Sequence, residues 1–213
     1  MNPFLYPKTK HVRQQTPRQY ATYQSFKPAL QREFRRRCVY CQMPDSIVNP
    51  QLYGVDHYRP KTLFPEWETR YENLFYCCNP CNSRKGDYWP SVAKLRTHFI
   101  PNPCDHEMFR HLRFRGATVT RRSNAGAIAL RLLDLNDPEV VKKRELVIES
   151  IAVFLEKRAE LLLLRGQLLC LDRADAKADI QTLQANLEKI RSHLTILCGA
   201  EPPPDDLPTH SPV

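Results

Sequence analysis

Several features that would set a compartment or a membrane topology are missing from this 213-residue chain. It has no run of about 18 apolar residues, the length that a membrane-spanning helix needs. Its first 37 residues are polar and basic and lack the apolar centre of a secretory signal, so we expect a cytoplasmic protein with no membrane contact. The Arg-rich, acid-poor start also resembles a mitochondrial targeting arm, which is the alternative.

Acidic residues are scarce in residues 1–37, which contain nine Lys/Arg and one Glu. The net charge is +8 over residues 1–37, −1 over 38–90, +5 over 91–136 and −3 over 137–213. Two basic segments therefore flank a nearly neutral one. Because clustered cations attract polyanions, this distribution favours nucleic-acid contact by residues 1–37 and 91–136, and solvated basic faces are the alternative.

Apolar spacing predicts an α+β fold in a largely α-helical chain that ends in a long helical hairpin. The chain is expected to begin with an irregular basic arm and to contain short strands only near its centre. The expected elements, in order, are a helix over 20–37, strands over 52–57 and 73–77, a short helix over 80–88, a hairpin over 112–121 turned at Gly116-Ala117, a helix capped by Ser123 and ending near 133, and a helix from Pro138.

The last third of the chain has coiled-coil-like spacing. Apolar residues recur at helical intervals over 138–171 and again over 180–197, at alternating steps of three and four. We expect residues 137–199 to form a helical hairpin that packs on itself or binds a partner, which would be a second copy or another protein. Residues 200–213, with five prolines and no apolar period, are expected to be a disordered tail.

The spacing of the cysteines predicts a metal site. Cys38-Val-Tyr-Cys41 and Cys78-Asn-Pro-Cys81 are two matched pairs, and four thiolates suit the tetrahedral coordination of a structural Zn²⁺. In a reducing compartment such pairs bind metal more often than they form disulfides, which disfavours a redox function. The spacing favours Cys78 over its neighbour Cys77, and we expect Cys77 to point to the other side of its strand as a small buried apolar residue.

Between and around the two pairs stand Val55-Asp56-His57-Tyr-Arg-Pro60, Asn73-Leu74 and Cys78-x-x-Cys81-Asn82-x-x-Lys85. Eight residues separate the two asparagines. In this order the block, residues 38–87, resembles the HNH endonucleases of the ββα-metal fold, in their four-cysteine zinc subgroup. The resemblance covers about a quarter of the chain. It implies a small ββα-metal core over residues 38–90, metal-dependent hydrolysis of DNA and two separate metal sites.

The chemistry of the residues agrees with that resemblance. Phosphodiester hydrolysis needs a base that deprotonates water and a cation that neutralises phosphate charge, and His57 is the good base of the block. The resemblance implies that His57 is the general base, that Asp56 and Asn82 hold the catalytic ion, and that Asn73 bridges the loop and orients His57. Since Asn82 stands where the family has His, oxygen ligands alone would hold the ion, which favours Mg²⁺ or Mn²⁺.

Basic residues near the block are candidates for binding the phosphate backbone, and solvated side chains are the alternative at each position. They are Arg59, Lys61, Arg84 and Lys85, together with Arg35, Arg36 and Arg37. His98, His106 and His111 lie outside the block and are interpreted as bystanders, and so are the isolated Cys104, Cys170 and Cys198.

A finer resemblance comes from His57-Tyr-Arg-Pro-Lys61, Trp67 and the later segment Ala129 to Asn136 with Arg144. These residues are similar to HNH proteins of the Septu and retron-linked anti-phage systems, and that resemblance implies a partner ATPase that docks on the C-terminal helices. A different class of function is also open, namely a zinc-ribbon nucleic-acid-binding or adaptor protein whose HNH-like site is inactive. The presence of Asp56, His57 and Asn82 together favours the nuclease.

Overall fold

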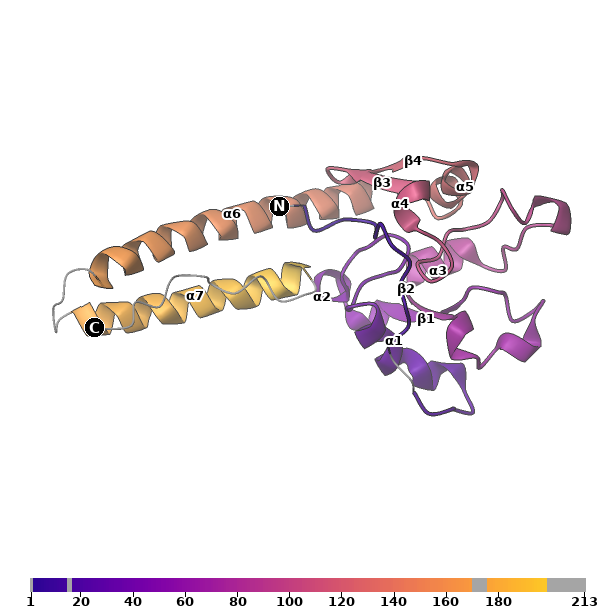
Figure 1. Ribbon diagram of the computed structural model, residues 1–213, viewed down its shortest axis with the longest axis horizontal. Helices are drawn as coiled ribbons and strands as arrows, with labels where there is room; N and C mark the ends of the chain where they lie inside the picture. Colours follow the sequence, from indigo (N-terminus) through magenta and orange to yellow (C-terminus); the bar gives the residue numbers. More distant parts are fainter. Residues whose placement is uncertain (1, 15–16, 170–175, 199–213) are drawn as a thin grey trace.

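Two long helices project from a body of short helices and strands (Figure 1). The computed structural model describes residues 2–14, 17–169 and 176–198. Within that part of the chain the strands form two separate two-stranded antiparallel sheets. No helix among the described residues is long and apolar enough to cross a membrane.

The first sheet and the helix that follows it form the centre of the body. Strand β1 (Tyr53–His57) pairs antiparallel with β2 (Leu74–Cys78), so that Tyr53 lies opposite Cys78 and His57 opposite Leu74. Every residue of β2 is buried, as its apolar sequence requires. Helix α3 (Asn79–Lys85) follows at once and ends at Gly86, which has a φ of 49°. The two predicted strands are confirmed to within one residue, whereas the predicted helix over 80–88 ends earlier, because Gly86 adopts a left-handed conformation.

The predicted helix over 20–37 is shorter than expected. A 3₁₀ turn, η1 (Tyr23–Phe26), leads into α1 (Lys27–Glu33). Arg35 and Arg36 then take positive φ angles of 50° and 59°, which end the helix and turn the chain toward Cys38. The prediction that the helix continues to residue 37 is therefore wrong, because the chain reverses here and Arg37 pairs with Pro44 across the cysteine turn.

The N-terminal segment lies across the body. Phe4 and Tyr6 are buried, and their rings lie 5.8 and 4.8 Å from the ring of Phe114. The Tyr6 hydroxyl donates a 2.6 Å hydrogen bond to the carbonyl of Tyr40. This segment therefore joins the second sheet to the cysteine region.

The second sheet and its helices form one side of the body. Strands β3 (Leu112–Arg115) and β4 (Thr118–Arg121) make the predicted hairpin, preceded by α4 (Met108–His111). Ser123 caps α5 (Asn124–Leu132) by accepting a 3.0 Å hydrogen bond from Gly126 N, as predicted. Short turns complete the body: α2 (Asp45–Val48), η2 (Pro50–Leu52), η3 (Pro65–Trp67), η4 (Tyr71–Asn73) and η5 (Val92–Lys94).

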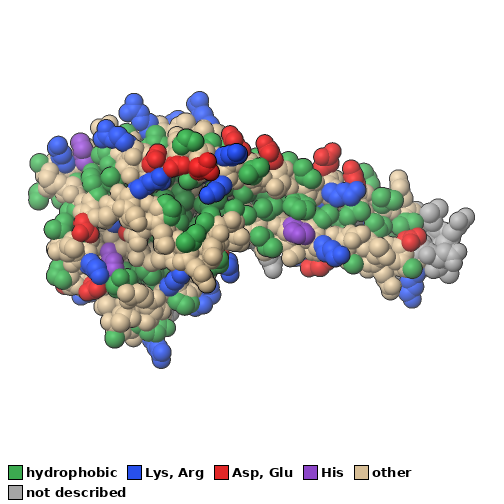
Figure 2. All heavy atoms as spheres, turned by 180° about the vertical axis from the view of Figure 1, so that it is seen from behind, with side chains coloured by type: hydrophobic (Ala, Val, Ile, Leu, Met, Phe, Trp, Pro, Cys, Tyr) green, Lys and Arg blue, Asp and Glu red, His purple; other side chains and the backbone are tan. Residues whose placement is uncertain are grey.

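Helices α6 (Pro138–Leu169) and α7 (Ala176–Cys198) form the predicted hairpin and pack against each other along their length (Figure 1). Ile151 and Leu161 of α6 and Leu187, Ile190 and Leu194 of α7 are buried. Figure 2 shows further hydrophobic side chains on the outside of the hairpin among charged ones. The predicted tail over 200–213 and Cys170 lie outside the described residues.

Both ends of the hairpin are fastened to the body. Arg144 of α6 is fully buried and donates to the carbonyls of Ala117, Leu135 and Cys41 at 3.0, 2.8 and 3.2 Å. Near the end of α7, the carbonyl of Ile196 accepts a 2.6 Å hydrogen bond from the Ser46 hydroxyl.

Candidate metal centre and active site

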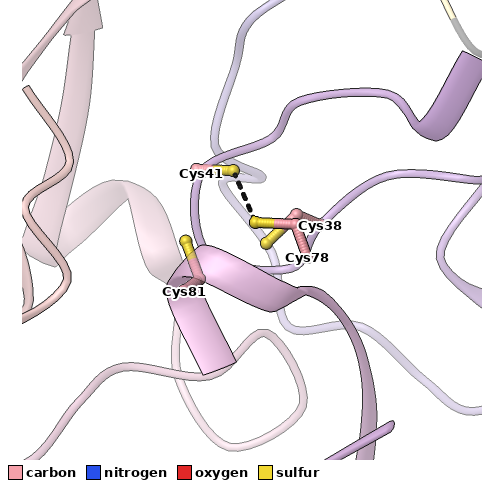
Figure 3. A group of neighbouring side chains, drawn as sticks. All are labelled: Cys38, Cys41, Cys78 and Cys81. Carbon is pink, nitrogen blue, oxygen red and sulfur yellow. Dashed lines mark hydrogen bonds between the residues drawn. The ribbon is translucent and has the colours of Figure 1, made fainter. Parts of the chain in front are cut away.

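The four predicted zinc ligands come together in the body. Cys38 and Cys41 lie in the turn after Arg37, Cys78 ends β2, and Cys81 lies in the first turn of α3. All four are buried, and their Sγ atoms lie within 4.8 Å of one another. Figure 3 shows the four side chains converging from the turn and the helix.

These sulfurs fit a tetrahedral zinc ion. A Zn–S distance near 2.3 Å places sulfurs about 3.8 Å apart, and the Sγ atoms of Cys41 and Cys78 are 3.7 Å apart. Although burial favours the neutral thiol, hydrogen bonds from the neighbouring cysteines lower the pKa of Cys38 well below its ordinary value. The same contacts raise the pKa of Cys78 and Cys81. Four thiolates in this buried place would therefore need a cation between them.

Cys77 is buried but does not join the cluster. Its Sγ atom lies 3.9 Å from that of Cys38 and donates to the carbonyl of Cys78 at 3.3 Å. Cys77 is thus buried as predicted, but its Sγ atom lies beside that of the predicted ligand Cys38 rather than on the far side of the strand. Its burial raises the pKa of its thiol, which keeps it neutral.

His57 ends β1 and is half-buried. Its Nε2 atom lies 3.0 Å from the backbone carbonyl oxygen of Glu68, which can only accept. In the neutral ring Nε2 therefore carries the proton, and Nδ1 has the lone pair that a general base uses. Tyr23 packs edge-on against the ring at 4.5 Å. Burial lowers the pKa of His57 below 6.5, which keeps the ring neutral near pH 7.

Asn73 closes the loop that leads from His57 to β2. Its Oδ1 atom accepts a 2.8 Å hydrogen bond from Arg59 N, and its Nδ2 atom donates to the carbonyls of Arg59 and Trp67 at 3.0 and 3.2 Å. The side chain is buried, so these bonds are not exchanged with water. The same loop carries Glu68, so Asn73 helps to fix the carbonyl that orients His57.

Asp56 has a different environment from the one expected for an open metal ligand. It is 2 % exposed, its Oδ1 atom lies 3.0 Å from Nζ of Lys85, and its Oδ2 atom accepts a 2.6 Å hydrogen bond from the hydroxyl of Tyr40. Burial and the charge of Asp56 raise the pKa of Tyr40 well above its ordinary value, so the hydroxyl remains a donor. Both carboxylate oxygens are thus engaged by protein groups.

The residues implied to hold a catalytic ion do not fit a hydrated Mg²⁺ or Mn²⁺ in this arrangement. Asn82 is half-buried on α3, where its amide oxygen is of a suitable type. However, Asp56 is buried and already has an ammonium group beside it, and a small divalent cation usually keeps several waters. In this arrangement the four cysteines therefore fit a Zn²⁺ ion, whereas Asp56 and Asn82 do not fit an Mg²⁺ or Mn²⁺ ion.

The basic residues expected to bind phosphate fall into two groups. Lys85 is 3 % exposed and paired with Asp56, so it is not available at the surface as expected, and Arg84 pairs with Asp137 and Asp134 at 2.7 and 3.4 Å. Helix α3 turns both side chains toward carboxylates of the body, and phosphate binding by either residue stays a prediction.

The other basic side chains reach the surface to different degrees. Arg35 is exposed, Arg36 is half-exposed and pairs with Asp45, and Arg37 donates to backbone carbonyls. Beside His57, Lys61 lies 4.9 Å from the ring centre of Tyr23 and 3.5 Å from a carboxylate oxygen of Glu68. Arg59 stacks at 4.1 Å on Trp67.

Several contributors were not foreseen from the sequence. Tyr40 stands inside the first cysteine pair, where its spacing gave no sign of a bond to Asp56. Glu68 contacts His57 through its backbone carbonyl, a group that every residue has, so the sequence could not single it out. His98, His106 and His111 belong to other parts of the body, and His106 and His111 pack with Phe99.

Comparison with known proteins gives one distant relative. The chain is 25% identical over 109 residues to the Septu protein PtuB of Bacillus thuringiensis, which covers 51% of this chain and 42% of PtuB. The chain thus spans about two fifths of the length of the relative that it matches. No family model and no solved structure matches the chain. This similarity links the chain, at a distance, to a protein of the Septu system.

Proposed function

We propose that the protein is an HNH-type endonuclease that hydrolyses phosphodiester bonds of DNA, with β1, β2 and α3 as its ββα core. The observation that carries the proposal is the state of His57. The 3.0 Å bond from Nε2 to the Glu68 carbonyl leaves Nδ1 as a base, and the lowered pKa keeps that base unprotonated near neutral pH.

In the proposed reaction His57 Nδ1 removes a proton from a water molecule as the water oxygen attacks phosphorus. The bond from phosphorus to the leaving oxygen breaks, and that oxygen receives a proton from solvent. Arg59 and Lys61 stand on the loop that follows His57, where they would hold the negative phosphate. Asn73 keeps this loop closed, so that base and phosphate-binding groups are held together.

An Mg²⁺ or Mn²⁺ ion at Asp56 and Asn82, as the resemblance implies, would neutralise charge on the phosphate and the leaving oxygen when bound. Lys85 would first have to move from Asp56. The zinc ion at the four cysteines would be structural, because all four of its coordination positions are filled by sulfur.

The contact between Lys85 and Asp56 also supports a second candidate, an inactive zinc protein that binds nucleic acid or acts as an adaptor. An enzyme whose ion site is permanently closed would bind DNA without cutting it. Such a protein would still use the exposed cations near His57.

Plasmid nicking separates the two candidates. Supercoiled DNA is incubated with Mg²⁺ or Mn²⁺ and with the wild-type chain, His57→Ala or the matched control His98→Ala. If the protein is a nuclease, the wild type and His98→Ala should nick the plasmid at similar rates. His57→Ala should be slower by a factor of roughly a hundred or more. Equal activity of His57→Ala and wild type would contradict the role of His57. Binding to DNA with no nicking under either metal would favour the second candidate.

The hairpin is the proposed partner-binding element of an anti-phage assembly. Its outer surface exposes Leu146, Val153 and Leu163, which are 54, 63 and 71 % exposed. The finer resemblance implies an ATPase as partner, and a second copy of the chain is the alternative. Light scattering coupled to size-exclusion chromatography distinguishes them, since a dimer that Val153→Glu dissociates would assign this surface to self-association.

A further inference from the structure

Lys85 is the most deeply buried cation next to the proposed active site. Its ammonium group lies 3.0 Å from Oδ1 of Asp56 and donates a 2.6 Å hydrogen bond to the backbone carbonyl of His57. The lysine side chain is 1 % exposed and the Asp56 side chain 2 %. The pair thus connects α3 to the end of β1 inside the body.

Its position on α3 explains why this lysine competes with an ion. Residues three apart on a helix are neighbours on one face, so Lys85 lies on the same face as Asn82. Asn82 and Asp56 are the two residues expected to supply oxygen ligands. The ammonium group therefore stands at the carboxylate that an incoming cation would need.

Removal of either charge from such a pair leaves the other buried without a partner, which is costly. Tyr40 satisfies the second oxygen of Asp56, and the His57 carbonyl accepts from the ammonium group as well. Both oxygens of Asp56 thus have partners within the protein. The cysteine cluster differs, because its four Sγ atoms lie within 4.8 Å of one another in an arrangement that suits a metal ion.

We propose that Lys85 is the resident cation of Asp56, and that a divalent cation reaches this carboxylate only by displacing Lys85. The inference deepens the proposed function, on which it rests for the expectation of an ion at Asp56. Lys85 then acts as a positioning residue that holds β1 beside His57 and delays metal binding. It does not contact phosphate in this state.

Electrostatics gives the direction of the effect. An ammonium group and a divalent cation that share one carboxylate in a buried place repel each other strongly, because the interaction grows as the effective dielectric constant falls. Substitution of Lys85 by a neutral residue removes this repulsion and leaves Asp56 in need of a cation. Affinity of Asp56 for a divalent cation should therefore rise.

The experiment measures binding of Mn²⁺ alone, without nucleic acid, by electron paramagnetic resonance and calorimetry on the zinc-loaded full chain. The variants are Lys85→Met, Lys85→Gln and Lys157→Met. Lys157 is exposed on α6, and its substitution changes the net charge equally. We expect Lys85→Met and Lys85→Gln to bind Mn²⁺ at least about tenfold more tightly than the wild type, and Lys157→Met to match the wild type.

Two further variants locate the effect. Adding Asp56→Asn to Lys85→Gln should abolish the gain, and Lys85→Arg, which keeps the charge, should behave like the wild type. Lys85→Gln retains a hydrogen-bond donor for Asp56 and the His57 carbonyl, so it can be tested even if Lys85→Met fails to fold. Zinc content and thermal unfolding verify that each variant is folded.

The inference is overturned if the neutral variants bind Mn²⁺ no better than the wild type, or if the gain persists without the Asp56 carboxylate. Because no DNA is present, a failure of plasmid nicking would overturn the proposed function and leave this result unaffected.

Discussion

At the scale of single residues, the body is organised by buried polar side chains whose bonding partners are nearly all backbone or charged groups. Asp56, Asn73, Lys85 and Arg144 are each at most 3 % exposed, and each makes two or more polar contacts. A buried polar group without a partner costs more than the bond itself is worth. Substitutions at these positions should therefore have large effects.

Asn73→Ala tests the loop that carries the Glu68 carbonyl. The change removes three hydrogen bonds, so His57 should lose its fixed orientation. We expect nicking to fall about a hundredfold while zinc content stays unchanged, since a small displacement of a catalytic group has an effect of that size. Asn49→Ala is the matched control, because Asn49 caps a turn elsewhere. A wild-type rate in Asn73→Ala would contradict this role.

Arg144→Met tests the joint between the hairpin and the cysteine turn. The substitution leaves the carbonyls of Ala117, Leu135 and Cys41 without their buried donor. We expect the free energy of unfolding to fall by about 3 kcal/mol, as measured by urea denaturation. The control is Arg115→Met on the exposed end of β3, which should change stability little. Equal effects of the two substitutions would show that the buried bonds do not matter.

At the scale of elements, the sequence predicted those features that depend on interactions between residues close together in the chain. The two cysteine pairs, the strands β1 and β2, the Ser123 cap and the helical hairpin were predictable because spacing, capping and apolar period each act over a few residues. The end of α1 was not, since Arg35 and Arg36 adopt left-handed conformations that the Arg37–Pro44 pairing demands. Tertiary pairing there overrides helix propensity.

Gly126 and Gly166 form a matched pair of helical glycines. A Cβ atom on Gly126 would lie 1.9 Å from the carbonyl oxygen of His111, whereas one on Gly166 would meet nothing within 4 Å. We expect Gly126→Ala to destabilise the protein by about 1–3 kcal/mol through overpacking of α5 on α4, and Gly166→Ala to stabilise α6 by about 0.5–1 kcal/mol. Thermal unfolding measures both. Shifts of the same sign would contradict the packing at α5.

His106 makes stability depend on pH. Burial lowers its pKa below 6.5 and the charge of His111 adds to this, while Asp105 opposes it. Below about pH 6.5 the unfolded chain therefore binds more protons at this residue than the folded one, and stability falls as pH falls. His106→Phe keeps the stacking on Phe99 and removes the proton site. Between pH 7 and pH 5 the melting temperature of the wild type should fall by more than that of His106→Phe. Parallel curves of melting temperature against pH would exclude His106 as the source.

At the scale of the whole molecule, distant segments meet at the cysteine turn. The N-terminal segment bonds to Tyr40, Arg144 of α6 bonds to Cys41, and Arg37 donates a 3.0 Å hydrogen bond to the carbonyl of Cys198. These contacts join residues up to 161 positions apart. No local pattern contains these contacts. The sequence therefore predicted nucleic-acid contact for the basic arm without showing that the arm packs on the body, and it placed Lys85 at the surface.

Removal of the proposed zinc ion tests this arrangement. Without the metal, four buried cysteines lose their common partner, and the turn to which both ends of the hairpin are fastened should loosen. Hydrogen–deuterium exchange after chelation should therefore increase at residues 38–44, at the start of α6 around Arg144 and at the last turn of α7. Residues 151–165, in the middle of α6 and away from these joints, should keep most of their protection, because they pack against α7 rather than the body. Faster exchange confined to the cysteine turn would mean that the hairpin holds its place without the metal. Uniform loss of protection along the hairpin would mean that its two helices depend on the body for their pairing.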